Sequence, residues 1–371
     1  MKTVSVPFLE AVSDVSAGNK KIPQSEFQPI GTLAIVDQGK SIIAGYTRDD
    51  SSAVKTASPL IVFGDHTRTF KYVDFPFAMG ADGVKILQTR QGFDPKYVYH
   101  FLRSREIPNA GYSRHFKFLK EIEVPKPQID EQRRIAAILD QADAVRAKRR
   151  QVLAHLDSLT QSIFHEMFGD PVENPNGFEL RPLAEWIDEG RPITYGILKP
   201  GPDVDDGVPY IRVADMQDGG VRVDSVRRTS TEISQAYRRS LLRSGDLLMS
   251  IRGHVGRFAH IPQELDGANI TQDSARLSIR DAATSAYVRA AMEAPGLQRW
   301  MARHTKGVAV RGLNIGDLRK VPLPVAPARL QAEFARRASQ VDHQRAAVQR
   351  ALATDIELLA SLQSRAFRGE L

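Results

Sequence analysis

Apolar side chains recur every three or four residues over Glu131–Met167, which predicts one long helix. One row of a heptad holds Ile135, Ala142, Leu156 and Ile163, and a second holds Ile138, Val145, Val152 and Leu159. Two rows at this spacing are typical of a coiled coil. Asp130 suits the N-cap position, and Gly169 with Pro171 ends the pattern, so we expect a spacer helix over 130–168.

The same pattern returns near the C-terminus. Glu131–Asp170 aligns without gaps on Leu330–Gly369, with eleven of 40 pairs identical, where about three are expected by composition. The second helix, expected over 328–371, has an apolar stripe that drifts between rows. We assign its core to the following residues: Phe334, Val341, Val348, Leu352, Leu359 and Leu362.

A second similarity lies at the front of each half, where Pro7–Val12 resembles Pro182–Ile187. The chain therefore consists of two similar globular parts, each followed by a helix. We expect the helices to pair antiparallel about a pseudo-twofold axis; the alternative is that each packs only on its own domain. The predicted domains are 1–129 and 182–327, with a linker over 169–181 rich in Pro, Gly and Asn.

Short runs rich in β-branched residues predict strands in both globular parts, and hence a mixed α+β fold. In the first part they are Leu33–Asp37, Ile42–Tyr46, Leu60–Phe63 and Gly83–Leu87, with a helix over Tyr97–Leu102. In the second they are Tyr210–Val213, Leu247–Ile251, Gly256–Ile261 and Ala275–Ile279, with a helix over Val288–His304.

The charge distribution points to a polyanion as ligand. The 371 residues carry a net charge of +7. Residues 1–130 hold 17 Lys/Arg against 14 Asp/Glu, and residues 171–329 hold 22 against 19, while the helices are nearly neutral. Basic globular parts and neutral helices favour nucleic acid contact by the former and protein contact by the latter. A merely solvated surface remains the alternative.

Catalytic and metal-binding motifs are scarce. Gly39-Lys-Ser41 imitates the end of a phosphate loop, but the leading glycine is Ala34, so we interpret it as a turn. Asp203, Asp205 and Asp206 lack the glycine and distal glutamate of a calcium loop. The chain has no cysteine, no apolar run of membrane-spanning length and no secretory signal, and we expect a cytoplasmic protein without its own metal or cofactor.

Basic residues on predicted loops are the candidates for DNA contact, because Arg reads guanine bidentately and Lys, Arg and His reach phosphates. Arg252-Gly-His254 and Lys306–Gly312 place such groups beside glycines, which let a backbone approach a ligand closely. The full set is Lys40, Arg48, His66, Arg68, Lys71, Arg114, His115 and Lys117 in the first part, and Arg212, Arg252, His254, Arg257, Lys306 and Arg311 in the second.

The chain resembles the DNA-specificity subunits of type I restriction-modification systems. The passages that carry the resemblance are Ile61–Arg68 with Phe77–Leu87, Gly207–Met216 with Ser244–Gly253, Leu119–Pro127 running into Asp130–Ile135, and Phe168–Gly177. They cover nearly the whole chain in the family's order. One departure is Leu330, which stands where the first helix has Glu131 and leaves the second helix's packing less defined.

The resemblance implies a subunit without catalytic residues that reads a split, asymmetric site in double-stranded DNA. It also implies two copies of a methyltransferase subunit, which bring S-adenosylmethionine and methylate adenine. Restriction subunits that use ATP and Mg²⁺ join such complexes in some systems, and a methyltransferase without a nuclease is equally compatible with the sequence. The competing hypotheses are a coiled-coil adaptor without a DNA role and a self-contained nuclease.

Overall fold

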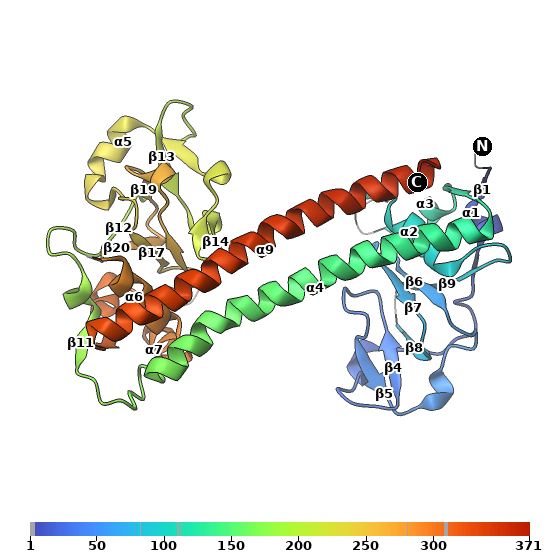
Figure 1. The fold of residues 1–371 in the computed structure, drawn as a ribbon, viewed down its shortest axis with the longest axis horizontal. Coiled ribbons are helices and arrows are strands. Elements are labelled where there is room, and N and C mark those ends of the chain that lie inside the picture. The colour runs from blue at the N-terminus through green and yellow to red at the C-terminus, as the bar shows by residue number, and fades with distance from the viewer. Residues whose placement is uncertain (1–3, 82, 110, 112, 280, 308–310) are drawn as a thin grey trace. The chain divides into compact units, whose positions relative to one another are not determined.

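The computed structural model describes residues 4–371 apart from 82, 110, 112, 280 and 308–310 (Figure 1). Its contacts divide the chain into two compact units: Met1–Gln151 with Gln349–Leu371, and Val152–Val348. Each unit thus contains one globular domain and parts of both long helices. In the described part of the chain, no helix combines the length and the apolar composition needed to cross a membrane.

The two long helices are α4, Ile129–Phe168, and α9, Ala328–Arg368. Pro125 and Pro127 precede α4 closely, and Pro cannot supply the backbone N–H that a helix interior needs. Both helices are followed by a glycine in the left-handed conformation, Gly169 at φ 73° and Gly369 at φ 75°. Glycine adopts this conformation without the penalty of a Cβ atom, so α4 ends where the sequence predicts, whereas α9 ends at Arg368, three residues before the predicted boundary.

The first globular domain is built on a pair of four-stranded sheets. One is antiparallel with order β2-β9-β6-β7, and the other, of order β3-β8-β4-β5, contains the parallel pairs β3/β8 and β4/β8. The strands are β1 Ser5–Pro7, β2 Val12–Asp14, β3 Lys21–Ile22, β4 Leu33–Val36, β5 Gly45–Thr47, β6 Leu60–Gly64, β7 Phe70–Val73, β8 Phe77–Gly80, β9 Val84–Thr89 and β10 Glu123–Pro125; the helices are α1 Phe8–Ala11, α2 Pro95–Arg103 and α3 Phe116–Leu119.

The second domain repeats this plan. Its sheet β12-β20-β17-β18 corresponds to β2-β9-β6-β7, and β11 pairs antiparallel with β21 as β1 does with β10. A sheet β16-β13-β19 and a hairpin β14-β15 complete it. The strands are β11 Leu180–Pro182, β12 Thr194–Tyr195, β13 Val208–Ile211, β14 Met216–Gln217, β15 Gly220–Val221, β16 Arg227–Thr229, β17 Leu247–Ser250, β18 Phe258–His260, β19 Asn269–Ile270, β20 Ser274–Leu277 and β21 Pro322–Pro324; the helices are α5 Thr231–Ala236, α6 Ala282–Glu293, α7 Pro295–His304 and α8 Ile315–Leu318.

The single helix predicted over Val288–His304 is wrong. Two helices, α6 and α7, occupy this region and are separated by Ala294, whose ψ of 144° is extended. Pro295 follows it, and a proline disfavours the helical conformation in the residue before it. The predicted fold class, in contrast, is confirmed: α+β domains in a twofold internal repeat with two long helices that pack together.

In the first unit, α9 ends against the core of the globular domain. The ring of Phe367 makes edge contacts with Tyr97 and Phe101 of α2, at centroid distances of 5.6 and 5.2 Å. The Tyr97 hydroxyl donates to the carbonyl of Pro125 at 3.2 Å, and Ile135 of α4 joins the same cluster. The domain is therefore attached to the beginning of α4 and to the end of α9.

The second unit repeats this contact with the helices exchanged. Phe168, at the end of α4, packs edge-on against Tyr287 of α6 and Phe334 of α9, at 5.0 and 5.9 Å. The Tyr287 hydroxyl donates to the carbonyl of Pro324 at 2.7 Å. Phe168 and Phe367 are identical pairs of the sequence repeat, as are Pro125 and Pro324. The sequence duplication is thus a duplication of contacts, and it requires the helices to run antiparallel within each unit, as α4 and α9 do in Figure 1.

Three of the four residues in one of the two predicted apolar rows on α4 face solvent. Val145, Val152 and Leu159 are 39%, 44% and 41% exposed. The inner row instead passes through Leu139, which is fully buried, and through Arg146, whose ion pair with Asp143 spans 2.8 Å. The apolar pattern predicted a row displaced by one residue from this inner row. A pattern of apolar residues cannot include an arginine that is accommodated in the interior by an ion pair. Of the other predicted core residues, Ile135, Phe334, Val341 and Leu359 are buried, whereas Ile138, Ala142, Leu156, Ile163, Val348, Leu352 and Leu362 are half-buried.

Candidate nucleic-acid interface

In the first domain, two loops meet at one end of the antiparallel sheet. Asp65 follows β6 and is 2% exposed. Its carboxylate accepts the backbone N–H of Phe116 at 2.7 Å, and its carbonyl accepts the backbone N–H of His115 at 3.2 Å. These bonds hold the β6–β7 loop, which carries His66 and Arg68, against the segment that leads into α3.

Corresponding loops meet in the second domain. The carbonyl of Ile251, directly after β17, accepts the N–H of Leu313 at 2.8 Å, and the carbonyl of Arg311 accepts the N–H of Gly253 at 3.0 Å. Arg252 also forms a β-bridge with Gly312, as does Lys306. Because β17 occupies the place of β6, both domains present a basic hairpin loop beside a basic loop at the same end of the same sheet. Residues 308–310 of the predicted Lys306–Gly312 motif, and Asp82 of the passage Phe77–Leu87, lie outside the described residues.

Most of the candidate basic residues lie on these loops or beside them. Lys40 is on the β4–β5 loop, which is tied to the β6–β7 loop by a 2.6 Å hydrogen bond from the Thr67 hydroxyl to the carbonyl of Gln38. Arg68 is half-buried and donates to the carbonyl of Ile107 at 3.1 Å. The exposed members of the set are Lys40, His66, Arg114, Lys117, Arg252, His254, Arg257, Lys306 and Arg311. Arg48 is exposed as well, but it follows β5 at the end of the sheet away from Lys40.

Lys71 and His115, predicted on exposed loops, lie in the interior. Lys71 is on strand β7, and its ammonium group donates to the carbonyl of Asp37 at 2.7 Å and faces the Asp37 carboxylate at 3.3 Å. Burial lowers the pKa of Lys71, and Asp37 opposes that shift. His115 is 1% exposed, with Nδ1 at 2.7 Å from the carbonyl of Asp65. Both residues therefore stabilise the loops through hydrogen bonds in the interior of the domain.

Arg212 is also occupied within its own domain. Its Nε and Nη2 atoms donate to the two carboxylate oxygens of Asp215 at 2.9 and 2.6 Å, and Nη2 donates to the carbonyl of Ser225 at 3.0 Å. Asp215 is fully buried. Burial alone would raise the pKa of Asp215, but the hydrogen bonds from Arg212 hold that pKa below its usual value. The role of Arg212 in this structure is to neutralise a buried carboxylate.

A cleft of about 570 Å³ opens beside the second pair of loops. Arg252 and Lys306 line it together with Tyr195, Gln272 and Asn314. The side-chain oxygen of Gln272 accepts a hydrogen bond from Arg252 Nη1 at 2.9 Å, which orients the guanidinium group. Amide side chains and an oriented guanidinium are the groups that read base edges in a major groove. No local motif marks Tyr195, Gln272 or Asn314, because they come together only through the sheet and the loops at its end.

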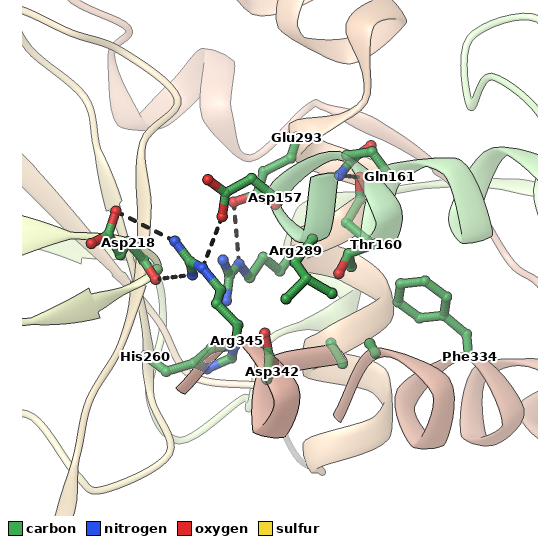
Figure 2. Close-up of a pocket in the computed structure, with 15 residues that line it drawn as sticks. Asp157, Thr160, Gln161, Asp218, His260, Arg289, Glu293, Phe334, Asp342 and Arg345 are labelled. Atoms are coloured by element: carbon green, nitrogen blue, oxygen red, sulfur yellow. Dashed lines mark hydrogen bonds and ion pairs between the residues drawn. The ribbon is translucent and has the colours of Figure 1, made fainter. Parts of the chain in front are cut away.

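A second cavity, of about 360 Å³, lies in the same unit among α4, α6, α9 and the β14–β15 hairpin (Figure 2). Figure 2 shows Arg345 between Asp157 and Asp218; the ion pairs span 2.8 and 3.4 Å. Burial, assisted by the charge of Arg289, lowers the pKa of His260 on its wall to about 4. These internal pairs attach the hairpin to α9, so the cavity is a structural junction. Among the residues the structure describes, no cluster of three metal-ligating side chains was found.

The comparison with family models finds no match. The type I restriction enzyme EcoBI specificity subunit of Escherichia coli is 30% identical over 322 residues, which cover 77% of this chain and 68% of that protein. The chain belongs to the type I restriction enzyme specificity subunits. A second member, the EcoR124I/EcoR124II specificity subunit of Escherichia coli, is 26% identical over 140 residues, or 34% of this chain and 35% of that protein.

Solved structures of type I restriction-modification proteins share this fold. The S subunit of a type I restriction-modification system from M. genitalium has a TM-score of 0.60 at 15% identity, covering 98% of this chain and 96% of that one. A structure described as the basis of complex assembly and conformational transition of the type I R-M system has a TM-score of 0.56 at 20% identity, covering 100% and 98%. The resemblance drawn from the sequence is therefore confirmed.

Proposed function

We propose that this chain is the DNA-recognition subunit of a type I restriction-modification complex and reads a bipartite site, one half with each domain. The observation that carries the proposal is the repeated loop pair: the same end of the same sheet presents basic side chains in both domains. Its relatives are restriction enzyme specificity subunits, which supports this role. We propose the recognition domains to be residues 1–129 and 182–327.

The two half-sites differ in sequence. The hairpin loop of the first domain has the sequence Asp65-His-Thr-Arg-Thr69, whereas that of the second has the sequence Ile251-Arg-Gly-His-Val-Gly-Arg257. Side chains of different size, charge and hydrogen-bonding pattern complement different base edges. The recognised DNA sequence is therefore asymmetric, with two short half-sites separated by a constant gap.

The exposed apolar residues of the helices form the contact with methyltransferase subunits. In the first unit, Val145 of α4 and Leu358 of α9 are 39% and 52% exposed, and they line a groove of about 240 Å³ with Ile138, Ala142 and Leu362. Apolar surface of this kind gains free energy when a partner removes it from water. The methyltransferase subunits supply S-adenosylmethionine and the adenine methylation; any restriction subunits supply ATP and Mg²⁺ chemistry, so this chain itself is not catalytic.

The test of recognition is a base-resolution map of methylated adenine in cells that make this chain together with its methyltransferase subunit. The expected result is a split motif that vanishes when this chain is omitted. Arg252→Ala with Arg311→Ala should then relax only one half of the motif, and Arg114→Ala with Lys117→Ala only the other. Methylation that persists unchanged without this chain would favour the adaptor hypothesis.

The docking surface is tested by co-purification. Val145→Asp with Leu358→Asp introduces charge into the proposed contact and should abolish recovery of the methyltransferase subunit with this chain. Ala144→Asp, also exposed on α4 but not on the groove, is the matched control and should retain it. Equal recovery with both variants would place the partner elsewhere.

A further inference from the structure

A cleft in the second unit is lined by six arginines. It has a volume of about 670 Å³ and lies at the end of β17 opposite the loops that carry Arg252. The arginines come from four separate segments and share the cleft with one acidic residue, Asp266: they are Arg191, Arg238, Arg239, Arg243, Arg276 and Arg319. So many like charges around one cleft repel each other, and an anion bound between them would relieve that repulsion.

Arg276 is the innermost of the six, at 4% exposure. Its guanidinium group donates to the carbonyls of Arg239 at 2.6 Å, Leu241 at 3.0 Å and Pro192 at 3.1 Å, and among the described residues it donates to no carboxylate. Its Nε atom is buried without a hydrogen-bond partner. Burial, followed by the charge of Arg191, lowers the pKa of Arg276. The floor of the cleft thus holds a buried guanidinium group whose hydrogen bonds, among the described residues, all go to backbone carbonyls, while the carboxylates of Asp246 and Asp188 act on its charge without a direct contact.

The other charged residues that line the cleft differ in whether they have an ion-pair partner. Arg191 forms a two-pronged ion pair with Asp246, with both contacts at 2.7 Å, so its charge is neutralised. Asp266 accepts the backbone N–H of Ser244 at 2.9 Å. Within the described part of the chain, no ion pair joins Arg238, Arg239 or Arg243 to a carboxylate, and all three are exposed. The rim of the cleft therefore presents guanidinium groups that have no acidic partner.

We propose that this cleft binds a phosphate group. Guanidinium groups match phosphate oxygens with paired N–H donors and are less strongly hydrated than ammonium groups, so clustered arginines favour phosphate over a carboxylate or a simple halide. Resting on the proposed function, the source of this phosphate is the DNA backbone beside the second half-site. The four-residue strand β17 spans about 13 Å, close to the roughly 12 Å width of a major groove, so loops in the groove leave the cleft near a groove edge.

The first arm of the test uses the full chain alone and does not depend on DNA recognition. Pyrophosphate should raise the melting temperature of the wild-type chain by at least about 2 °C at saturating concentration. Arg238→Ala with Arg239→Ala should lose this rise. The matched control is Arg329→Ala with Arg336→Ala, which removes the same charge from exposed positions of α9 in the same unit. It should keep the rise.

The second arm measures binding of duplex DNA that carries the recognised motif, between 50 and 200 mM salt. Loss of two phosphate contacts lowers the slope of log affinity against log salt by about 1.8, so the Arg238→Ala, Arg239→Ala variant should show a salt effect about tenfold smaller over this range. The recognised base sequence should stay the same.

The two arms separate the sources of phosphate. A lost pyrophosphate effect with a lowered DNA slope supports the backbone as ligand; a lost pyrophosphate effect with an unchanged slope supports a phosphate cleft that takes a free phosphate compound. If the Arg238→Ala, Arg239→Ala variant behaves like the wild-type chain in both arms, the cleft is only a charged surface and the proposal is wrong. A wild-type chain that gives no split motif contradicts the proposed function, while the pyrophosphate arm still decides the cleft.

Discussion

Removing one phenylalanine from the end of a long helix should loosen only the domain that receives it. Phe367 is 9% exposed and packs edge-on against Tyr97 and Phe101, while Phe168 is 4% exposed and packs on Tyr287. Truncating a buried phenylalanine to alanine costs about 3–5 kcal/mol, through lost burial and the cavity left behind. At about 1.4 kcal/mol per factor of ten, local opening should increase at least a hundredfold.

Hydrogen exchange read by mass spectrometry measures this opening for each segment. Phe367→Ala should accelerate exchange in α2, 95–103, and leave α6, 282–293, unchanged; Phe168→Ala should do the reverse. Phe367→Leu and Phe168→Leu, which keep most of the volume, should show the same pattern with smaller effects. If Phe367→Ala loosened α6 as much as α2, or left α2 protected, the exchanged attachment of helix ends to domains would be refuted.

Three further predictions concern side chains whose surroundings the structure defines. Arg212→Ala removes the charged partner of the fully buried Asp215, which keeps only hydrogen bonds from a backbone N–H and from the Ser225 hydroxyl, and it should cost about 3–5 kcal/mol in chemical denaturation. Arg252→Ala should change stability little, and equal effects would contradict the structural role of Arg212. The pKa of His260 falls from 6.5 to about 4 on folding, so the unfolded chain binds more protons than the folded chain between these two pH values. The free energy of unfolding should therefore decline as the pH falls through this window, by at most about 3 kcal/mol. His260→Gln should make that decline smaller. Gln132 receives the N–H of Asp94 at 2.9 Å and donates to the carbonyls of Gly92 and Pro127, so Gln132→Ala should lower the melting temperature by several degrees, an effect absent if those groups find water instead.

Local signals in the sequence were sufficient to predict the two long helices, most strands and the repeat. A helix boundary depends on caps, prolines and glycines within a few residues, which is why α4 ends before Gly169 as expected; Gly369 ends α9 in the same way, although the predicted helix continued to residue 371. The repeat itself determined that Phe168 and Phe367 would have similar surroundings. The division of one predicted helix into α6 and α7 was also marked locally, by Pro295, although the apolar periodicity concealed it.

Only the tertiary structure decided which polar residues are interior and which form sites. Lys71 and His115 are as charged or polar in sequence as Arg252, yet remote partners, Asp37 and Asp65, hold them in the interior. The rows of α4 differ for the same reason, because Arg146 is tolerated inside by its ion pair while Val145 faces solvent.

The two clefts depend on tertiary structure still more. Tyr195, Arg252 and Gln272 meet at one end of a sheet, and the six arginines of the phosphate cleft meet at the other. Spacing along a chain reports on neighbours within a few residues, whereas the free energy of burying or exposing a charge depends on groups that only folding brings near. The sequence by itself therefore determined the family, the duplication and the framework of this protein, and the packed structure decided which of its many basic residues remain available to a ligand.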